Sequence, residues 1–113
     1  MTKPQLEDLK KRILAATGED RELDRLIGET LDPDGALTCR YSSSVDDCIA
    51  LIGAILPDWS WHVGHGPLGV MPYASLHRKT TADDRSDMRV EATASTVPLA
   101  LLRAMVKALS PDR

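Results

Sequence analysis

Three histidines are the residues of this 113-residue chain best suited to acid–base or metal chemistry. His62 and His65 lie three positions apart in an extended stretch, an offset that points two side chains to opposite faces of a strand. His62 and His77 fall on the same predicted face of neighbouring strands, where a cross-strand pair forms readily. Zinc sites use three or four close ligands, so we expect this pair to lie on the surface without a bound metal. We also expect no cofactor and no catalytic residue.

Other residues with chemical potential fit structural roles better. Residues 64–69 match G-x-G-x-x-G after a strand, but no helix opens behind the glycines, so a hairpin turn is expected rather than a dinucleotide site. Cys39 and Cys48 are nine positions apart and lack redox or zinc spacing, which favours two free thiols over the alternative, a disulfide. Asp32 and Asp34 begin like a calcium loop whose remaining ligands are absent, so a turn is expected.

The elements that must position these residues follow from periodicity and from capping signals. Apolar residues at helical spacing, with caps such as Ser44 and Thr96, predict four helices, at residues 3–16, 21–31, 45–56 and 97–109. Alternation of apolar and polar residues predicts three strands, at residues 59–63, 68–77 and 88–94. Pro72 cannot donate to a ladder, so the second strand is expected at a sheet edge or with a bulge.

This order, α-α-α-β-β-β-α, predicts an α+β fold with a three-stranded antiparallel sheet covered by helices in α/β/α layers. Helices 45–56 and 97–109 are the most apolar segments and are expected to cover the sheet. One domain is expected over residues 1–113, with residues 1–18 as an N-terminal helical extension of a core at 21–109.

Trp59 and Trp61 are the largest apolar residues of a chain that has no phenylalanine. They alternate with Ser60 and share a strand face with Val63, and each indole can bury about 150–250 Å². We expect both rings in the core between the sheet and its helices. The alternative is an interface: a partly covered face would make the same rings a binding hot spot.

The charge pattern indicates the kind of partner. The net charge of −3 argues against binding by phosphate neutralisation, so no nucleic acid partner is expected. No apolar run approaches about 18 residues and the N-terminus is polar, so we expect a cytoplasmic protein without a membrane span. Residues 32–58 hold five aspartates and one arginine, an acidic surface suited to a basic protein. The candidate partner-binding residues are Asp32, Asp34, Asp46, Asp47, Trp59 and Trp61.

Several segments together carry a family resemblance. They are Tyr41-Ser42-Ser43-Ser44 before a helix, Trp59-x-Trp61, Pro72-Tyr73-Ala74, and Glu91-Ala92-Thr93-Ala94 before Pro98-Leu99-Ala100-Leu101-Leu102. Over about residues 21–109 the chain resembles the phage ABA sandwich domain, a family of small phage and prophage proteins. The resemblance implies helix–sheet–helix layering and a phage or prophage source, and it carries over no activity, catalytic residue or cofactor.

The expected function is that of a non-enzymatic phage or prophage accessory protein that binds a protein partner, either a host defence protein or a second copy. If the partner is a second copy, the two chains could form a homodimer through the first two helices. The rival is an anti-CRISPR-like inhibitor of a bacterial defence system, whose acidic surface would occupy a basic nucleic-acid channel. A small metal-dependent enzyme is the third alternative.

Overall fold

The computed structural model describes residues 3–31, 39–66, 71–78 and 88–110. The α+β class and the order of elements are as predicted. The helices are α1 (Lys3–Ala15), α2 (Arg21–Leu31), α3 (Val45–Ile55) and α4 (Val97–Leu109), and the strands are β1 (Trp59–His65), β2 (Pro72–Arg78) and β3 (Met88–Thr93). Residues 68–70, expected to open the second strand, lie outside the described residues, as do Asp32 and Asp34.

The sheet is an antiparallel meander in the order β1-β2-β3. The register places Trp61 opposite Leu76, and Leu76 opposite Val90. β2 is therefore the central strand, and its register with β1 runs through Pro72 without a bulge, so the expectation that Pro72 would place the strand at an edge or in a bulge is wrong. Pro72 is tolerated because it is the first residue of the strand, and its carbonyl still accepts a hydrogen bond from the N–H of Ala94 at 3.2 Å.

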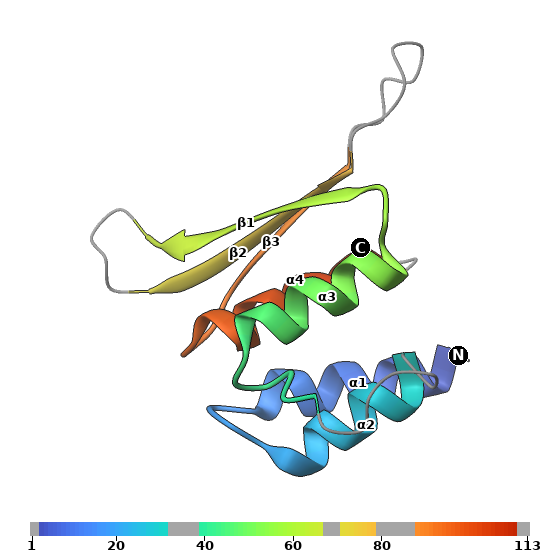
Figure 1. Cartoon of the computed structure of the whole chain (residues 1–113). Helices are drawn as coiled ribbons and strands as arrows, with labels where there is room; N and C mark the ends of the chain where they lie inside the picture. The colour runs from blue at the N-terminus through green and yellow to red at the C-terminus, as the bar shows by residue number, and fades with distance from the viewer. Residues whose placement is uncertain (1–2, 32–38, 67–70, 79–87, 111–113) are drawn as a thin grey trace.

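The helices lie on one side of the sheet. α4 packs against β2 and β3, α3 packs beside α4 and reaches β1, and α1 packs on α4 and α2. Figure 1 shows the resulting layers: the sheet, then α3 with α4, then the α1–α2 hairpin. This sheet–helix–helix stacking differs from the helix–sheet–helix order that the α/β/α expectation and the family resemblance implied. Among the described residues, the outer sheet face has no helix over it.

The core lies around α4, which is enclosed between the sheet and α1. Four of its large side chains, Leu99, Leu101, Leu102 and Met105, have no exposed surface. The N-terminal helix belongs to the same core through Leu6, Leu9 and Ile13, which are all buried. On the sheet, Ala74, Leu76, Val90 and Ala92 are buried against the helices, as their alternation predicted.

Local capping fixes where the helices begin. Ser44 caps α3 by accepting a hydrogen bond from the Asp47 N–H at 3.2 Å, and Thr96 caps α4 by accepting one from the Leu99 N–H at 3.3 Å. Both caps were predicted, because a hydroxyl that satisfies a free N–H of the first turn is a local signal. The carboxylate of Asp47 does not complete a capping box: it accepts a hydrogen bond from the Arg40 N–H at 2.7 Å.

Candidate functional site

The two tryptophans do not form a buried pair between the sheet and the helices. The Trp61 side chain points to the helix side of the sheet, since it lies opposite the buried Leu76, yet it is 45% exposed. Trp59 and Val63 on the same face are half-buried. The expectation of a buried pair is wrong because α4 lies mainly under β2 and β3, and β1 has only limited contact with α3 and α4. Trp61 is therefore not a core side chain.

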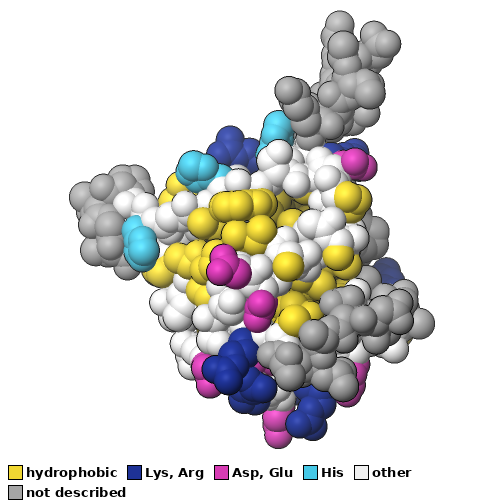
Figure 2. All heavy atoms as spheres, in the orientation of Figure 1, with side chains coloured by type: hydrophobic (Ala, Val, Ile, Leu, Met, Phe, Trp, Pro, Cys, Tyr) yellow, Lys and Arg dark blue, Asp and Glu magenta, His cyan; other side chains and the backbone are white. Residues whose placement is uncertain are grey.

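The exposed indole belongs to a continuous apolar surface. We call it the β1–α3 face and define it by the exposed Trp61 with the half-buried Trp59, Val63, Ile49 and Ile55. Figure 2 shows apolar side chains gathered over β1 and α3, with acidic side chains among them. On α3 the small residues Ala50, Gly53 and Ala54 are also exposed.

The backbone of β1 is open on its outer edge. The hairpin bond from the Gly66 N–H to the Met71 carbonyl, 2.9 Å, fixes which residues of β1 face β2. Along an antiparallel strand, the N–H and C=O groups of successive residues point alternately toward the partner strand and away from it. Since the Gly66 N–H points toward β2, the backbone groups of Trp61, Val63 and His65 point away from it. The N–H of Trp59 is already bonded to the Leu56 carbonyl at 3.0 Å. No hydrogen bond from elsewhere in the described residues reaches the outward groups of the other three.

Side chains of α4 bond to the opposite edge of the sheet, on β3. Arg103 donates to the Thr93 carbonyl at 2.9 Å, and Lys107 donates to the Glu91 carbonyl at 2.6 Å. Both carbonyls point away from β2. An edge strand with free backbone groups is a template for pairing, and charged side chains are a common protection. Within the described ranges the two edges therefore differ: α4 side chains bond to two outward carbonyls of β3, and no hydrogen bond reaches the outward groups of Trp61, Val63 and His65 on β1.

Acidic residues border the β1–α3 face. Residues 45–65 contain three aspartates and no lysine or arginine. Asp46 and Asp58 are exposed, whereas Asp47, named as a partner-binding candidate, is engaged by the Arg40 backbone. The candidates Asp32 and Asp34 lie outside the described residues. Of the six sequence candidates, Asp46 lies on α3 and Trp59 and Trp61 lie on β1, the two elements that carry the β1–α3 face.

The outer sheet face carries the histidine pair. His62 lies opposite Ser75 and His77 opposite Ser60, so the two histidines share the predicted face but are diagonal neighbours. With Tyr73, Ser75 and Arg89 they line an open hollow of about 520 Å³. The rings of His62 and Tyr73 have centroids 6.0 Å apart, and the tyrosine ring also covers Gly64, where an added Cβ would lie 3.4 Å from it.

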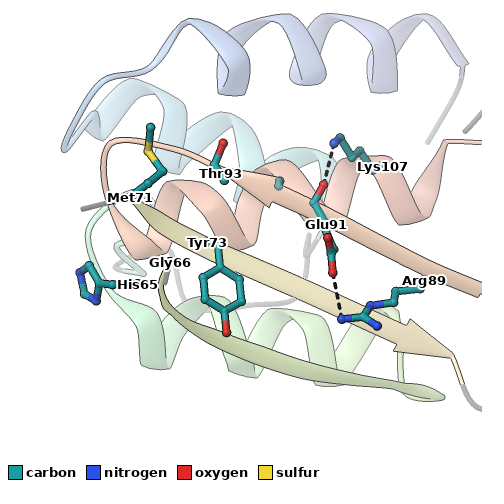
Figure 3. Close-up of a pocket in the computed structure, with 9 residues that line it drawn as sticks. His65, Gly66, Met71, Tyr73, Arg89, Glu91, Thr93 and Lys107 are labelled. Atoms are coloured by element: carbon teal, nitrogen blue, oxygen red, sulfur yellow. Dashed lines mark hydrogen bonds and ion pairs between the residues drawn. The ribbon is translucent and has the colours of Figure 1, made fainter. Parts of the chain in front are cut away.

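A second hollow, of about 790 Å³, continues over β3. Figure 3 shows how Tyr73, Arg89, Glu91 and Lys107 lie around it. Arg89 pairs with the Glu91 carboxylate at 2.9 Å and donates from Nε to the Ser75 hydroxyl at 3.3 Å. These polar groups satisfy one another, and sequence reasoning missed the arrangement because it depends on register across strands.

The chemistry that this outer face can perform is limited by its contacts. Within the described residues, neither His62 nor His77 hydrogen-bonds to Ser75, so Ser75 has no histidine base paired with it. In the same residues, no group of three or more His, Cys, Asp or Glu side chains is arranged to hold a metal ion. His65 lies on the other face of β1 from His62, as the offset of three required.

The cysteines are both free. Cys48 is buried, and its thiol donates to the Tyr41 carbonyl at 2.9 Å. Burial raises the pKa of this thiol far above its ordinary value, and the nearby carboxylates of Asp47 and Asp24 raise it further. Cys48 is therefore a packing residue without the thiolate character that a nucleophile needs.

The chain matches no protein-family model, no curated protein and no solved structure. No helix in the described part of the chain has both the length and the apolar character needed to cross a membrane. In the part of the chain that the structure describes, the fold is an α+β domain whose sheet has α4 side chains bonded to its β3 edge and no such bonds at its β1 edge.

Proposed function

We propose that this chain is a non-enzymatic protein-binding module that docks its partner on the β1–α3 face. The observation that carries the proposal is Trp61, a large apolar side chain 45% exposed on a strand edge that has no β-partner among residues 3–31, 39–66, 71–78 and 88–110. Covering the exposed part of an indole of about 150–250 Å² removes roughly 70–110 Å² from water. At about 25 cal/mol per Å² this contributes about 2–3 kcal/mol, the size of an interface hot spot.

The charge of the surroundings supports a basic partner. The exposed carboxylates of Asp46 and Asp58 flank the apolar surface, and residues 45–65 hold no cation to neutralise them. Complementary charge steers a partner to the face and disfavours acidic competitors. A phage or prophage accessory role, implied by the family resemblance, is compatible with this mode of action. Inhibition of a defence protein would be one example of this mode of action, with the acidic face bound to the basic channel of that protein.

Site-specific photo-crosslinking tests the proposal. A benzophenone derivative of phenylalanine replaces Trp61 in one protein and Leu14 in another, and each is irradiated in a bacterial lysate. Leu14 is the matched control, because it is 48% exposed and lies on α1. We expect a discrete crosslinked protein from position 61 only. Equal capture from both positions, or capture from position 14 alone, would contradict the proposal.

The captured partner then allows a quantitative test with purified proteins. Trp61→Lys should weaken binding by about 30-fold to 150-fold, the equivalent of about 2–3 kcal/mol, while Leu14→Lys leaves binding within about twofold. Circular dichroism and thermal unfolding confirm that both variants fold. Unchanged affinity in a folded Trp61→Lys protein would refute the docking surface.

A further inference from the structure

We infer that the partner adds a β-strand to the open edge of β1, and that this strand alternates apolar side chains with lysine or arginine. The inference rests on the proposed function, since it names the binding mode and the partner chemistry of the same face. It requires three features: space beside β1, free backbone groups along β1, and a surface that selects the side chains of the added strand.

The width of the layers provides the space. Strands in a sheet lie about 4.8 Å apart, and packed helices lie about 8–10 Å apart, so two helices match about four strands. The described sheet has three strands over the pair α3 and α4. Because α4 is centred under β2 and β3, the helix layer extends past the sheet at β1. The sheet is therefore one strand narrower than the helices beneath it, on the side where Trp61 is exposed.

The backbone of β1 provides the hydrogen bonds. Its seven residues span about 23 Å at about 3.3 Å per residue. The outward N–H and C=O groups belong to every second residue, Trp61, Val63 and His65. This is the interval at which an added strand forms hydrogen bonds. In β-strand addition such main-chain bonds supply affinity, and the alternate side chains supply specificity.

The two faces of the edge select the side chains. On the helix side, the added strand would place every second residue beside Trp61 and Val63 and above α3, a surface without lysine or arginine that favours valine, isoleucine or leucine. The remaining residues would point to the outer sheet face, beside Ser60 and His62, and the exposed Asp58 directly precedes β1. Lysine or arginine at those positions complements the Asp58 carboxylate and the negative charge of residues 45–65, and glutamate opposes it.

The same layer geometry disfavours a second copy of the chain as the occupant. Pairing β1 with its own copy would bring two α3 helices to the dyad, where only about one helix width is available. An extended segment has no helix layer of its own and avoids this conflict.

A synthetic peptide provides the probe. The peptide is an acetylated and amidated heptamer, Lys-Val-Lys-Val-Lys-Val-Lys, labelled with fluorescein and titrated with the full chain by fluorescence anisotropy. We expect saturable binding, and at least tenfold weaker binding when glutamate replaces every lysine. Equal binding of the two peptides would overturn the charge selection. Absence of binding by the lysine peptide would overturn the inference.

Backbone methylation tests whether the peptide pairs as a strand. Methylating the valine nitrogens removes the N–H groups that face β1 in an antiparallel arrangement, and methylating the lysine nitrogens removes those that face it in a parallel one. We expect one methylated isomer to lose binding and the other to keep it. Binding by both isomers would show that docking uses no strand pairing and would overturn the inference.

Matched proline variants locate the edge. Val63→Pro removes an outward N–H from β1 without breaking a bond to β2, and Thr93→Pro does the same on β3. We expect at least tenfold weaker peptide binding for Val63→Pro and no change for Thr93→Pro. Trp61→Lys gives an independent loss if Val63→Pro does not fold. Equal effects of the two proline variants would place the peptide elsewhere.

The peptide and crosslinking results separate the two proposals. If position 61 captures a partner but the peptide does not bind, strand addition is wrong and the protein-binding function stands. If the peptide binds as expected but position 61 captures nothing beyond position 14, strand addition stands as a property of the edge and the proposed function is wrong.

Discussion

Arg103 is predicted to hold the N-terminal helix to the sheet and to protect the β3 edge at the same time. One guanidinium nitrogen donates to the Leu14 carbonyl at 3.0 Å and the other to the Thr93 carbonyl at 2.9 Å, so the side chain bridges α1 and β3. A charge-assisted hydrogen bond contributes about 1.5–3 kcal/mol when buried, and partial exposure reduces this to about 1 kcal/mol for each bond. Arg103→Ala should therefore cost about 2 kcal/mol.

For a domain of this size about 1 kcal/mol corresponds to roughly 4 °C, so thermal unfolding of Arg103→Ala should shift Tm down by about 8 °C. Lys107→Ala is the matched control, since it lies one turn further along α4 and removes one bond from an exposed amine. Its shift should be less than half as large. A Tm for Arg103→Ala within about 2 °C of the unmodified protein would refute the bridging role.

Two further predictions concern buried polar groups. Asp24→Ala leaves the buried Ser42 N–H without its acceptor at 2.7 Å, so it should lower the free energy of unfolding, measured by urea titration, by about 1–3 kcal/mol. Asp24→Asn keeps an acceptor oxygen and should lower the free energy of unfolding by less. Equal losses for the two variants would contradict this role of Asp24. Because burial raises the pKa of Cys48, this thiol should resist alkylation at pH 8 until the chain unfolds, while the half-buried Cys39 reacts first. Above about pH 8.5 the unfolded chain binds fewer protons than the folded one, so stability should fall as pH rises; a rise would contradict the buried neutral thiol.

Local signals made much of the fold predictable. Ser44 and Thr96 define the starts of α3 and α4 because a cap and its N–H partner lie three residues apart. The alternation of Val90 and Ala92 predicted their buried face, since the period of two is a property of the strand itself. Element order and antiparallel pairing followed from these local features.

The exposure of Trp61 could not be predicted in the same way. Alternation establishes that Trp61 shares a face with Val63, but the extent of cover depends on where α4 sits under the sheet, a property of distant residues. The central position of β2 likewise follows from the whole meander and not from Pro72. The protection of β3 by Arg103 and Lys107 requires the packing of α4 on β3, which no short segment encodes.

Amide hydrogen exchange at Val63 tests most directly whether the β1 edge is open and receives a strand. In the free chain this N–H should exchange at nearly the unprotected rate, while the N–H of His62, which faces β2, is protected by the ladder. Addition of saturating Lys-Val-Lys-Val-Lys-Val-Lys peptide should slow exchange at Val63 at least tenfold and leave the N–H of Thr93 on β3 unchanged. A Val63 amide already protected in the free chain, or one that the peptide does not slow, would contradict the account.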